Sequence, residues 1–313
     1  MDSLRFTVAY ASPTATNPIK PMSLSLSDRI KALIQYPLPH HLLSRLMYRI
    51  TRIEWRPFKN AMIRLISKRF DIDISLAREQ NLDAYPHFNS FFTRPLRDGV
   101  RPIVAGADTI ACPVDGTISQ IEAIRDGRIF QAKGHDYSLQ ALLGGHQHLH
   151  DLFVDGQFTT IYLSPRDYHR IHMPLTGKLK EMLYIPGRLF SVSPTTTRAI
   201  PGLFARNERL VTVFETDFGP MAVILVGAIF VAGIETVWTE NFGDKMFRTF
   251  QHWDYANDKT LPAITLEKGA EMGRFNMGST AILLFGKQQM EWSKSLHPEQ
   301  AVQMGQLIGQ RLS

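Results

Sequence analysis

Residues 210–234 read LVTVFETDFGPMAVILVGAIFVAGI, and this stretch decides the fold class. Two apolar runs flank the residues DFGP (217–220), whose Gly-Pro pair is typical of a tight turn. Such runs, rich in valine and isoleucine, are typical of buried β-strands. The apolar part, residues 221–234, is 14 residues long and contains two glycines, whereas a bilayer-spanning helix needs roughly 20 apolar residues. We therefore expect core strands here and no transmembrane helix.

Short strands separated by glycine-containing turns continue on both sides of this stretch. Residues 117–124 and 128–132 flank the pair Asp-Gly at 126–127, and residues 158–163 follow a second Asp-Gly pair at 155–156. Because Asp-Gly pairs are typical of β-hairpin turns, we expect a hairpin at each. Residues 280–285 read TAILLF and predict a further buried strand. With the helical pattern before residue 70, these strands predict an α+β fold: a β-rich core with N-terminal amphipathic helices.

Residues 27–70 have the periodicity of amphipathic helices, divided into short pieces by prolines. Apolar side chains recur every three or four positions between residues 42 and 53, and residues 58–70 repeat the arrangement. A basic stripe runs beside the first apolar face and consists of Arg45, Arg49, Arg52 and Arg56. This pattern is typical of a helix that lies in a membrane interface. A helical hairpin that packs on the core with its arginines in water would have the same pattern.

The basic charge lies in the N-terminal quarter of the chain. Residues 1–70 contain 12 Lys and Arg against 3 Asp and Glu, whereas residues 71–313 contain 23 against 26. This excess favours an anionic partner, either a lipid surface or a nucleic acid. We expect residues 1–26 to form a flexible leader, and the first 21 contain no apolar run long enough for a signal peptide.

Composition narrows the classes of function. The 313 residues are 44% hydrophobic and 20% charged, which suits a globular protein with a sizeable core and excludes a disordered chain. A single cysteine, Cys112, excludes an intramolecular disulfide and a multi-cysteine zinc site. The motifs G-x-G-x-x-G, G-x-x-x-x-G-K-[ST] and G-x-S-x-G are missing, so neither nucleotide binding nor an α/β-hydrolase is indicated.

Three tracts contain residue types that chemistry requires. Asp115 lies in CPVDGTISQ, His169 and His172 lie in SPRDYHRIHMP, and Ser279 follows Gly278 in EMGRFNMGST. Each tract also has a structural interpretation, as a turn or as a buried polar group. A serine, a histidine and an aspartate can form a nucleophile, its base and an orienting group where the fold brings them together.

Two other sets of residues have a weaker claim to function. His146, His148 and His150 occupy every second position, as metal ligands on one face of a strand would. A glycine-flanked run of this kind more often lies in an exposed loop, so we expect no metal there. Arg206 and Arg209 in LFARNER have the charge to hold a phosphate, although we expect them to be surface arginines in a turn.

Seven tracts resemble the bacterial phosphatidylserine decarboxylase family, in the family's order and with compatible spacing. The likeness runs from about residue 40 to residue 285, and the histidine run at 146–150 is not part of it. The family usually has Leu-Gly-Ser-Thr where this chain has Met-Gly-Ser-Thr at 277–280, and the two side chains are similar in volume. The tracts are FNSFFTRPLRDGVRP (88–102), PVDGTISQ (113–120), QAKGHDYSL (131–139), TTIYLSPRDYHRIHMP (159–174), LFARNER (203–209), FGPMAVILVGA (218–228) and GRFNMGST (273–280).

The resemblance implies a self-processing enzyme that decarboxylates phosphatidylserine to phosphatidylethanolamine. It implies autocatalytic cleavage between Gly278 and Ser279, which leaves a β chain of residues 1–278 and an α chain of residues 279–313. Ser279 would become a pyruvoyl group that forms a Schiff base with the substrate amine, without a metal or pyridoxal phosphate. His172 would be the base for the serine, Asp115 would orient it, and His169 would return a proton or position the substrate carboxylate.

The same resemblance changes the interpretation of the basic helices. A lipid substrate favours docking of residues 27–70 on the anionic cytoplasmic face of the bacterial membrane, with residues 71–313 as the catalytic core, and makes nucleic acid an unexpected partner. A homo-oligomer is also expected. Two alternatives stay open: a Ser279–His172–Asp115 hydrolase that never forms pyruvoyl, and a non-enzymatic basic module that binds lipid or nucleic acid through residues 27–70.

Overall fold

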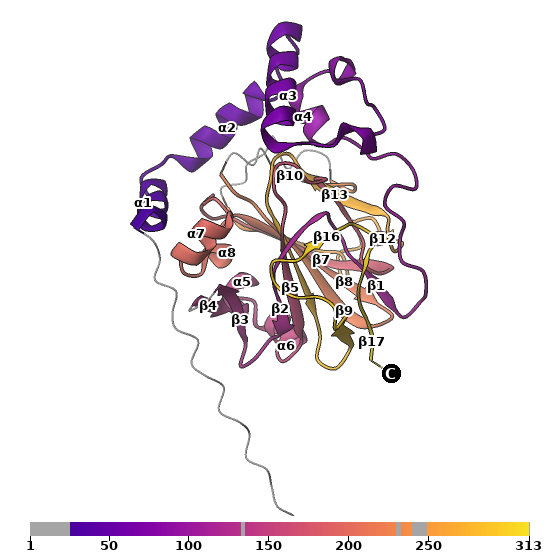
Figure 1. Ribbon diagram of the computed structural model, residues 1–313. Coiled ribbons are helices and arrows are strands. Elements are labelled where there is room, and N and C mark those ends of the chain that lie inside the picture. The colour runs from indigo at the N-terminus through magenta and orange to yellow at the C-terminus, as the bar shows by residue number, and fades with distance from the viewer. Residues whose placement is uncertain (1–25, 133–134, 230–232, 240–248, 313) are drawn as a thin grey trace, which may run out of the picture.

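The computed structural model describes residues 26–132, 135–229, 233–239 and 249–312. Its central element is a nine-stranded sheet in which neighbouring strands are antiparallel (Figure 1). The strands follow one another across the sheet in the order β11 (Gln251–Asp254), β7 (Gly177–Ile185), β8 (Arg209–Thr216), β9 (Gly219–Val226), β14 (Thr280–Phe285), β5 (Gln157–Tyr162), β2 (Gly116–Ala123) and β16 (Ala301–Val302), and β12 (Thr265–Leu266) also pairs with β7.

The stretch that predicted core strands forms the β8–β9 hairpin. Thr216 pairs with Gly219 across a two-residue turn, and the φ of +104° at Gly219 is one that side-chain-bearing residues rarely adopt. Strand β9 ends at Val226. Residues 230–232 lie outside the described residues, and β10 (Ile234–Thr236), which follows them, belongs to another sheet.

Strand β14 is buried on both faces of the sheet, as the run TAILLF predicts. Ala281, Leu283 and Phe285 face one hydrophobic cluster, whereas Ile282 and Leu284 face another. Because β14 lies between β5 and β9, its two ends are fixed from both sides. The residue that directly precedes β14 is Ser279, so the centre of the sheet sets the position of this serine.

Smaller elements cover the two faces of the large sheet. Short helices pack on one face: α5 (Leu139–Leu142), α6 (Gln147–Phe153), α7 (Pro194–Ala199) and α8 (Leu203–Arg206). Two three-stranded sheets supply residues to the core on the other face. One contains β1 (Thr109–Ala111), β17 (Leu307–Arg311) and β15 (Met290–Trp292), and the other contains β10, β13 (Glu271–Phe275) and β6 (Arg170–His172). This arrangement confirms the predicted α+β fold with a β-rich core.

At the first predicted Asp-Gly hairpin only the turn forms, closed by an antiparallel bridge between Arg125 and Arg128, and at the second no hairpin forms. Asp126 and Gly127 do make a turn with positive φ, but β3 (Arg128–Ala132) pairs with β4 (His135–Ser138) instead of continuing along β2. At the second pair, residues 147–153 form helix α6, so this turn joins a helix to a strand. The reason is the four-residue spacing of Leu149 and Phe153, which places both side chains in the core from one helix face.

The N-terminal segment is helical, as its periodicity predicts. It contains α1 (Leu26–Gln35), α2 (His40–Ile50) and α3 (Arg56–Phe70), and after two 3₁₀ turns, η1 (Ile74–Leu76) and η2 (Leu82–Ala84), comes α4 (Phe88–Phe92). Figure 1 shows α2, α3 and α4 at one end of the core, beside β10 and β13. Ile63 of α3 packs with Phe88, Phe91 and Phe92, and Met277 packs against the same cluster. The predicted flexible leader lies outside the described residues except for Leu26, which begins α1.

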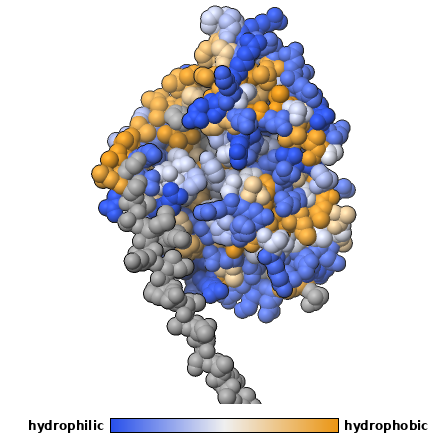
Figure 2. Space-filling view, in the orientation of Figure 1, coloured by the Kyte–Doolittle hydropathy of each residue, from blue (hydrophilic) through white to orange (hydrophobic). Residues whose placement is uncertain are grey.

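The outward side of α1 and α2 carries apolar side chains that the core does not use. Figure 2 shows this hydrophobic band along the edge formed by the two helices. The exposed apolar residues of this end include Leu26, Ile30, Leu33, Ile34, Leu42, Leu46, Ile53 and Trp55. Within the described residues, no helix is long and apolar enough to cross a membrane.

Candidate active site

Ser279 lies fully buried at the entrance to β14, directly after Gly278. Its backbone carbonyl accepts a hydrogen bond from Leu163 N at 2.9 Å. Its Oγ, by contrast, has no hydrogen-bond partner among the described residues. A buried hydroxyl without a partner costs free energy of about 1–3 kcal/mol, so the Ser279 Oγ is a strained polar group at the start of β14.

Gly278 is packed closely against two groups. A Cβ atom at this position would lie 3.2 Å from the Leu163 carbonyl oxygen and 3.7 Å from His169 Cε1. The structure therefore places His169 beside Gly278, whereas within the described residues no hydrogen bond joins His172 or Asp115 to the Ser279 hydroxyl.

His169 is a buried, neutral imidazole. Its ring stacks on Phe92 with 4.1 Å between ring centroids, and neither ring nitrogen has a well-formed hydrogen bond within the described part of the chain. Burial, and after it the charge of Arg94, lowers the pKa of His169 to about 3. The carbonyls of Ser164 and Pro165 oppose this shift from nearby, although neither is aligned for a hydrogen bond. His169 thus offers a neutral ring beside Gly278 across the physiological pH range.

His172, on β6, has both ring nitrogens engaged. Nδ1 lies 2.8 Å from the Gly269 carbonyl oxygen and Nε2 lies 3.0 Å from the Tyr168 hydroxyl. The carbonyl can only accept, so Nδ1 donates to it, and Nε2 of the neutral ring accepts from Tyr168. Burial lowers the pKa of His172, whereas the Gly269 carbonyl and the charges of Glu271 and Asp115 oppose the change.

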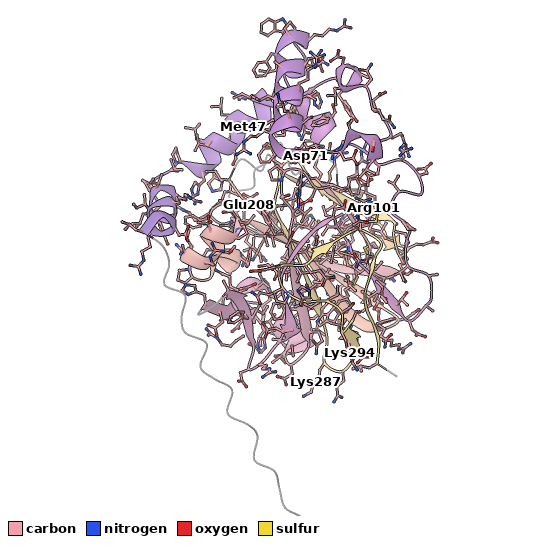
Figure 3. All side chains as sticks on the ribbon, viewed as in Figure 1. Met47, Asp71, Arg101, Glu208, Lys287 and Lys294 are labelled. Carbon is pink, nitrogen blue, oxygen red and sulfur yellow. The ribbon has the colours of Figure 1, made fainter. Side chains whose placement is uncertain are left out.

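Asp115 is held by partners other than the histidines. Arg101 binds both carboxylate oxygens, with Nη2 to Oδ2 at 2.6 Å and Nε to Oδ1 at 2.9 Å, and the Met304 N–H donates to Oδ1 at 2.8 Å. Among the described residues, Asp115 makes no hydrogen bond to His172, but it is near enough for its charge to raise the pKa of that histidine. A cavity of about 150 Å³, whose lining includes Arg101, Asp115 and Tyr168, lies beside the two groups (Arg101 is labelled in Figure 3).

Residues of the tract at 88–102 contact the site, and the sequence alone did not predict a role for any of them. Phe92 stacks on His169, Asn89 donates to the Asn276 carbonyl at 2.9 Å, and Arg101 binds Asp115. Tyr168 also had no assigned role, although its four-residue separation from His172 is a signal that could have found the pair.

The histidine run at 146–150 begins α6 and is not the exposed loop that we expected. His148 Nε2 lies 3.0 Å from Glu181 Oε2, and His252 Nε2 lies 3.1 Å from the same oxygen. Across the described ranges, no group of three or more histidine, cysteine or acidic side chains is placed to hold a metal ion.

Of the two arginines of LFARNER, Arg206 is exposed as expected, whereas Arg209 is not. Arg209 is buried, not exposed as expected, because its guanidinium donates to the carbonyls of Ala141, Leu142, Ala205 and Asn207. Arg206 donates to the Tyr36 hydroxyl at 3.3 Å.

The sequence profile described as phosphatidylserine decarboxylase matches residues 88–310, and a profile described as PSD matches residues 30–71. The chain belongs to the phosphatidylserine decarboxylase family. Its similar proteins include the phosphatidylserine decarboxylase proenzyme of Pseudomonas putida strain GB-1, which is 51% identical over 91% of this chain and 99% of the relative. The proenzyme of Pseudomonas aeruginosa strain LESB58 is 50% identical over 91% of this chain and 98% of its own length. The recognition made from the seven tracts is thereby confirmed.

Proposed function

We propose that this chain is the precursor of a phosphatidylserine decarboxylase that cleaves itself between Gly278 and Ser279. Family membership and the proenzyme relatives support the decarboxylase activity. The observation that carries the cleavage site is the buried Ser279 hydroxyl, which lacks a partner next to a glycine packed against His169. The products are a β chain that ends at Gly278 and an α chain that begins at residue 279.

The cleavage uses atoms of the chain itself. Ser279 Oγ attacks the Gly278 carbonyl carbon, the C–N bond breaks as the serine nitrogen takes a proton, and an ester joins the two residues. Loss of the Cα proton and of the Cβ–O bond then releases Gly278 as a carboxylate and leaves a dehydroalanine at position 279. Tautomerisation and addition of water expel ammonia, which leaves a pyruvoyl group.

His172 is the base proposed for the serine, and the electrostatics of the two histidines support this choice. A base whose pKa is near 3 takes a proton from a hydroxyl poorly, and the pKa of His169 is about 3. Burial lowers the pKa of His172 too, but its carbonyl and carboxylate neighbours oppose that shift by favouring the charged form. In this conformation Tyr168 occupies Nε2, so His172 exchanges that hydrogen bond when it accepts the serine proton. Asp115 stabilises the resulting cation through its charge.

The surroundings of Ser279 fit a pyruvoyl group. Position 279 is fully buried, its backbone is anchored on Leu163, and the neutral ring of His169 lies beside the preceding residue, Gly278. When formed, the group supplies a carbonyl that condenses with a primary amine and accepts the electrons left by departing CO₂. The role proposed for His169 is to hold the substrate carboxylate or to return a proton to carbon. Its low pKa favours the first, because a neutral ring N–H can donate a hydrogen bond but the ring carries no extra proton to transfer.

Residues 27–70 are proposed to dock the enzyme on the cytoplasmic face of the bacterial membrane. The exposed apolar band of α1 and α2 lies beside exposed arginines, including Arg45 and Arg49. Apolar insertion and attraction to anionic lipid act together in such a segment. Arg52 differs from the other members of the predicted stripe, because it is directed to the core and forms an ion pair with Glu235 at 3.7 Å.

Intact-mass analysis of the purified protein tests the proposal. We expect two chains that join at residues 278 and 279, with the α chain blocked at its N-terminus. Ser279→Ala should give one uncut, inactive chain, because no hydroxyl remains to attack. Active protein with only the uncut mass would contradict the self-cleavage, and hydrolysis of an ester by that uncut chain would support the Ser279–His172–Asp115 hydrolase. An α chain with a free serine amine would indicate ordinary proteolysis.

A further inference from the structure

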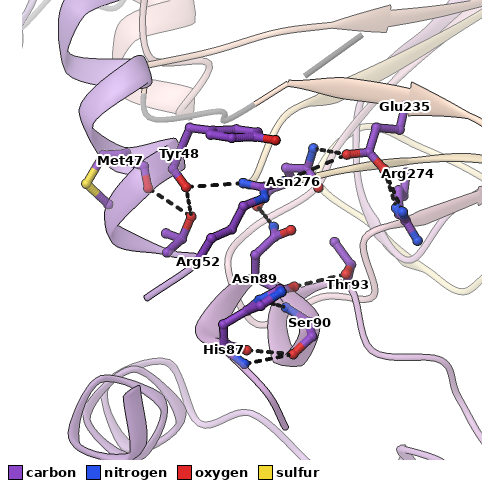
Figure 4. A network of polar contacts seen from close by, with 11 residues as sticks. Met47, Tyr48, Arg52, His87, Asn89, Ser90, Thr93, Glu235, Arg274 and Asn276 are labelled. Carbon is purple, nitrogen blue, oxygen red and sulfur yellow. Dashed lines mark hydrogen bonds and ion pairs between the residues drawn. The ribbon is translucent and has the colours of Figure 1, made fainter. Parts of the chain in front are cut away.

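Asn276, two residues before Gly278, is held through three polar groups, and Figure 4 shows the contacts with Asn89 and Glu235. Its backbone N–H donates to the Gly233 carbonyl at 3.1 Å, and its backbone carbonyl accepts from Asn89 Nδ2 at 2.9 Å. Its own Nδ2 donates to Glu235 Oε1 at 2.7 Å. The side chains of Asn89 and Asn276 are buried, so water does not compete for these hydrogen bonds.

Glu235 is itself fixed by two arginines. Arg274 donates to Glu235 Oε2 from Nε at 2.8 Å and approaches the same oxygen with Nη2 at 2.6 Å. Arg52, two residues after the end of α2, lies 3.7 Å from the other oxygen. The carboxylate that binds Asn276 therefore has a set orientation, as expected of a side chain that must hold another group in place.

The far side of the proposed cleavage site is anchored as well. The Leu163 N–H binds the Ser279 carbonyl at 2.9 Å, and β14 then continues into the centre of the sheet. Between the two anchors, Met277 packs against the cluster that contains Phe88 and Phe91. The Gly278–Ser279 peptide thus lies between two residues whose backbones are fixed by hydrogen bonds, Asn276 and Ser279, three positions apart.

We infer that Asn89 and Glu235 are positioning residues for the self-cleavage, through the hydrogen bonds that fix Asn276. This inference rests on the proposed function. A serine that attacks the carbonyl of the residue before it needs the intervening peptide in one particular orientation. A displacement of about 1 Å from such a geometry costs on the order of 10²-fold in rate. Neither residue touches the reacting atoms, and both act through Asn276.

The rate of cleavage of freshly translated precursor tests this role. We expect Asn89→Ala to cleave at least tenfold more slowly than the wild type. Gln131→Ala is the matched control, because Gln131 is an equally buried amide that binds the carbonyls of Thr197 and Ile200. The control should lose stability and keep the wild-type cleavage rate. Cleavage of Asn89→Ala within twofold of the wild type would overturn the inference.

A second pair of variants separates the positioning role from a loss of packing. Glu235→Gln keeps an oxygen that can accept from Asn276 Nδ2, so it should cleave faster than Glu235→Ala. Asn89→Asp has nearly the shape of asparagine but donates to the Asn276 carbonyl only when its carboxyl is protonated. Its cleavage rate relative to wild type should therefore rise at least tenfold from pH 8 to pH 5.

If the cleavage rate of Asn89→Asp relative to the wild type stayed constant with pH, the hydrogen-bonding role of Asn89 would be refuted, even if Asn89→Ala failed to fold. The wild-type precursor distinguishes this failure from that of the proposed function. A wild type that never cleaves contradicts the self-processing itself. A wild type that cleaves beside equally fast Asn89 and Glu235 variants contradicts the positioning inference alone.

Discussion

The pH dependence of self-cleavage follows from the environment of His172. In water a histidine has a pKa of 6.5, and burial of His172 lowers that value. A base must be neutral to accept the serine proton. With a pKa of 6.5, about 3% of the base would be neutral at pH 5 against nearly all of it at pH 8, so cleavage would slow roughly 30-fold. Because the pKa is lowered, we expect a clearly smaller loss of rate over this interval.

The assay follows the disappearance of labelled precursor at a series of pH values. Precursor made by brief cell-free translation is diluted into buffers from pH 5 to pH 8, and intact and cleaved chains are separated by electrophoresis. Circular dichroism of the Ser279→Ala chain over the same range shows whether the fold persists. A 30-fold or larger fall in rate, with the fold intact, would show that the base titrates like an exposed histidine and would refute the reasoning from burial.

Three further predictions concern the histidines, a buried carboxyl and the docking helices. His172→Ala should slow self-cleavage by about 10²- to 10⁴-fold, whereas His169→Ala should cleave and then decarboxylate poorly; the reverse result on a gel and in a CO₂-release assay would exchange the two roles. Glu208 lies beneath α2 (Figure 3), and burial raises its pKa from 4.5 to about 7. Since the folded state binds the Glu208 proton more tightly than the unfolded state, the free energy of unfolding should fall by roughly 3 kcal/mol as pH rises from 4.5 to 7. Urea titrations of the Ser279→Ala chain should show this pH dependence, and the added substitution Glu208→Gln should remove it. The double variant Arg45→Gln, Arg49→Gln should bind anionic vesicles about 30-fold more weakly at low salt, at roughly 1 kcal/mol per charge. The control variant Lys287→Gln, Lys294→Gln, altered at the opposite end of the molecule in Figure 3, should bind like the wild type. Equal losses of binding in both variants would contradict docking through α2.

The elements that the sequence predicts well are those whose signal is local. The run TAILLF is apolar throughout because β14 is covered on both faces, and the DFGP turn closes the β8–β9 hairpin between neighbouring strands. Helix α6 was missed because an Asp-Gly pair serves equally after a helix and within a hairpin. The four-residue spacing of Leu149 and Phe153 was the better guide at that point.

In the candidate site, too, the residues with a local sequence signal could be predicted, and those that depend on distant contacts could not. Ser279, Gly278 and His169 come from tracts that identify the family, and the fold places them together. The supporting contacts could not be predicted, because they join residues far apart in the sequence. Asn89 and Asn276 are separated by 187 positions, and no periodicity links them. Only the close pair Tyr168 and His172 was within reach of sequence reasoning.

Helix α2 combines the two interpretations that the periodicity left open. Its outward residues Leu42 and Leu46 are exposed, as an interfacial helix requires, whereas Ser44 is buried as in a helix packed on the core. At its end, the Thr51 carbonyl accepts from the Asn89 N–H and Arg52 pairs with Glu235. One short helix therefore lies between the proposed membrane surface and the residues that hold the cleavage site. Because the outward and inward side chains are different residues, substitutions of the outward ones can weaken membrane docking without slowing self-cleavage. Arg52 belongs with the inward residues, since it pairs with Glu235, which holds Asn276 near the cleavage site.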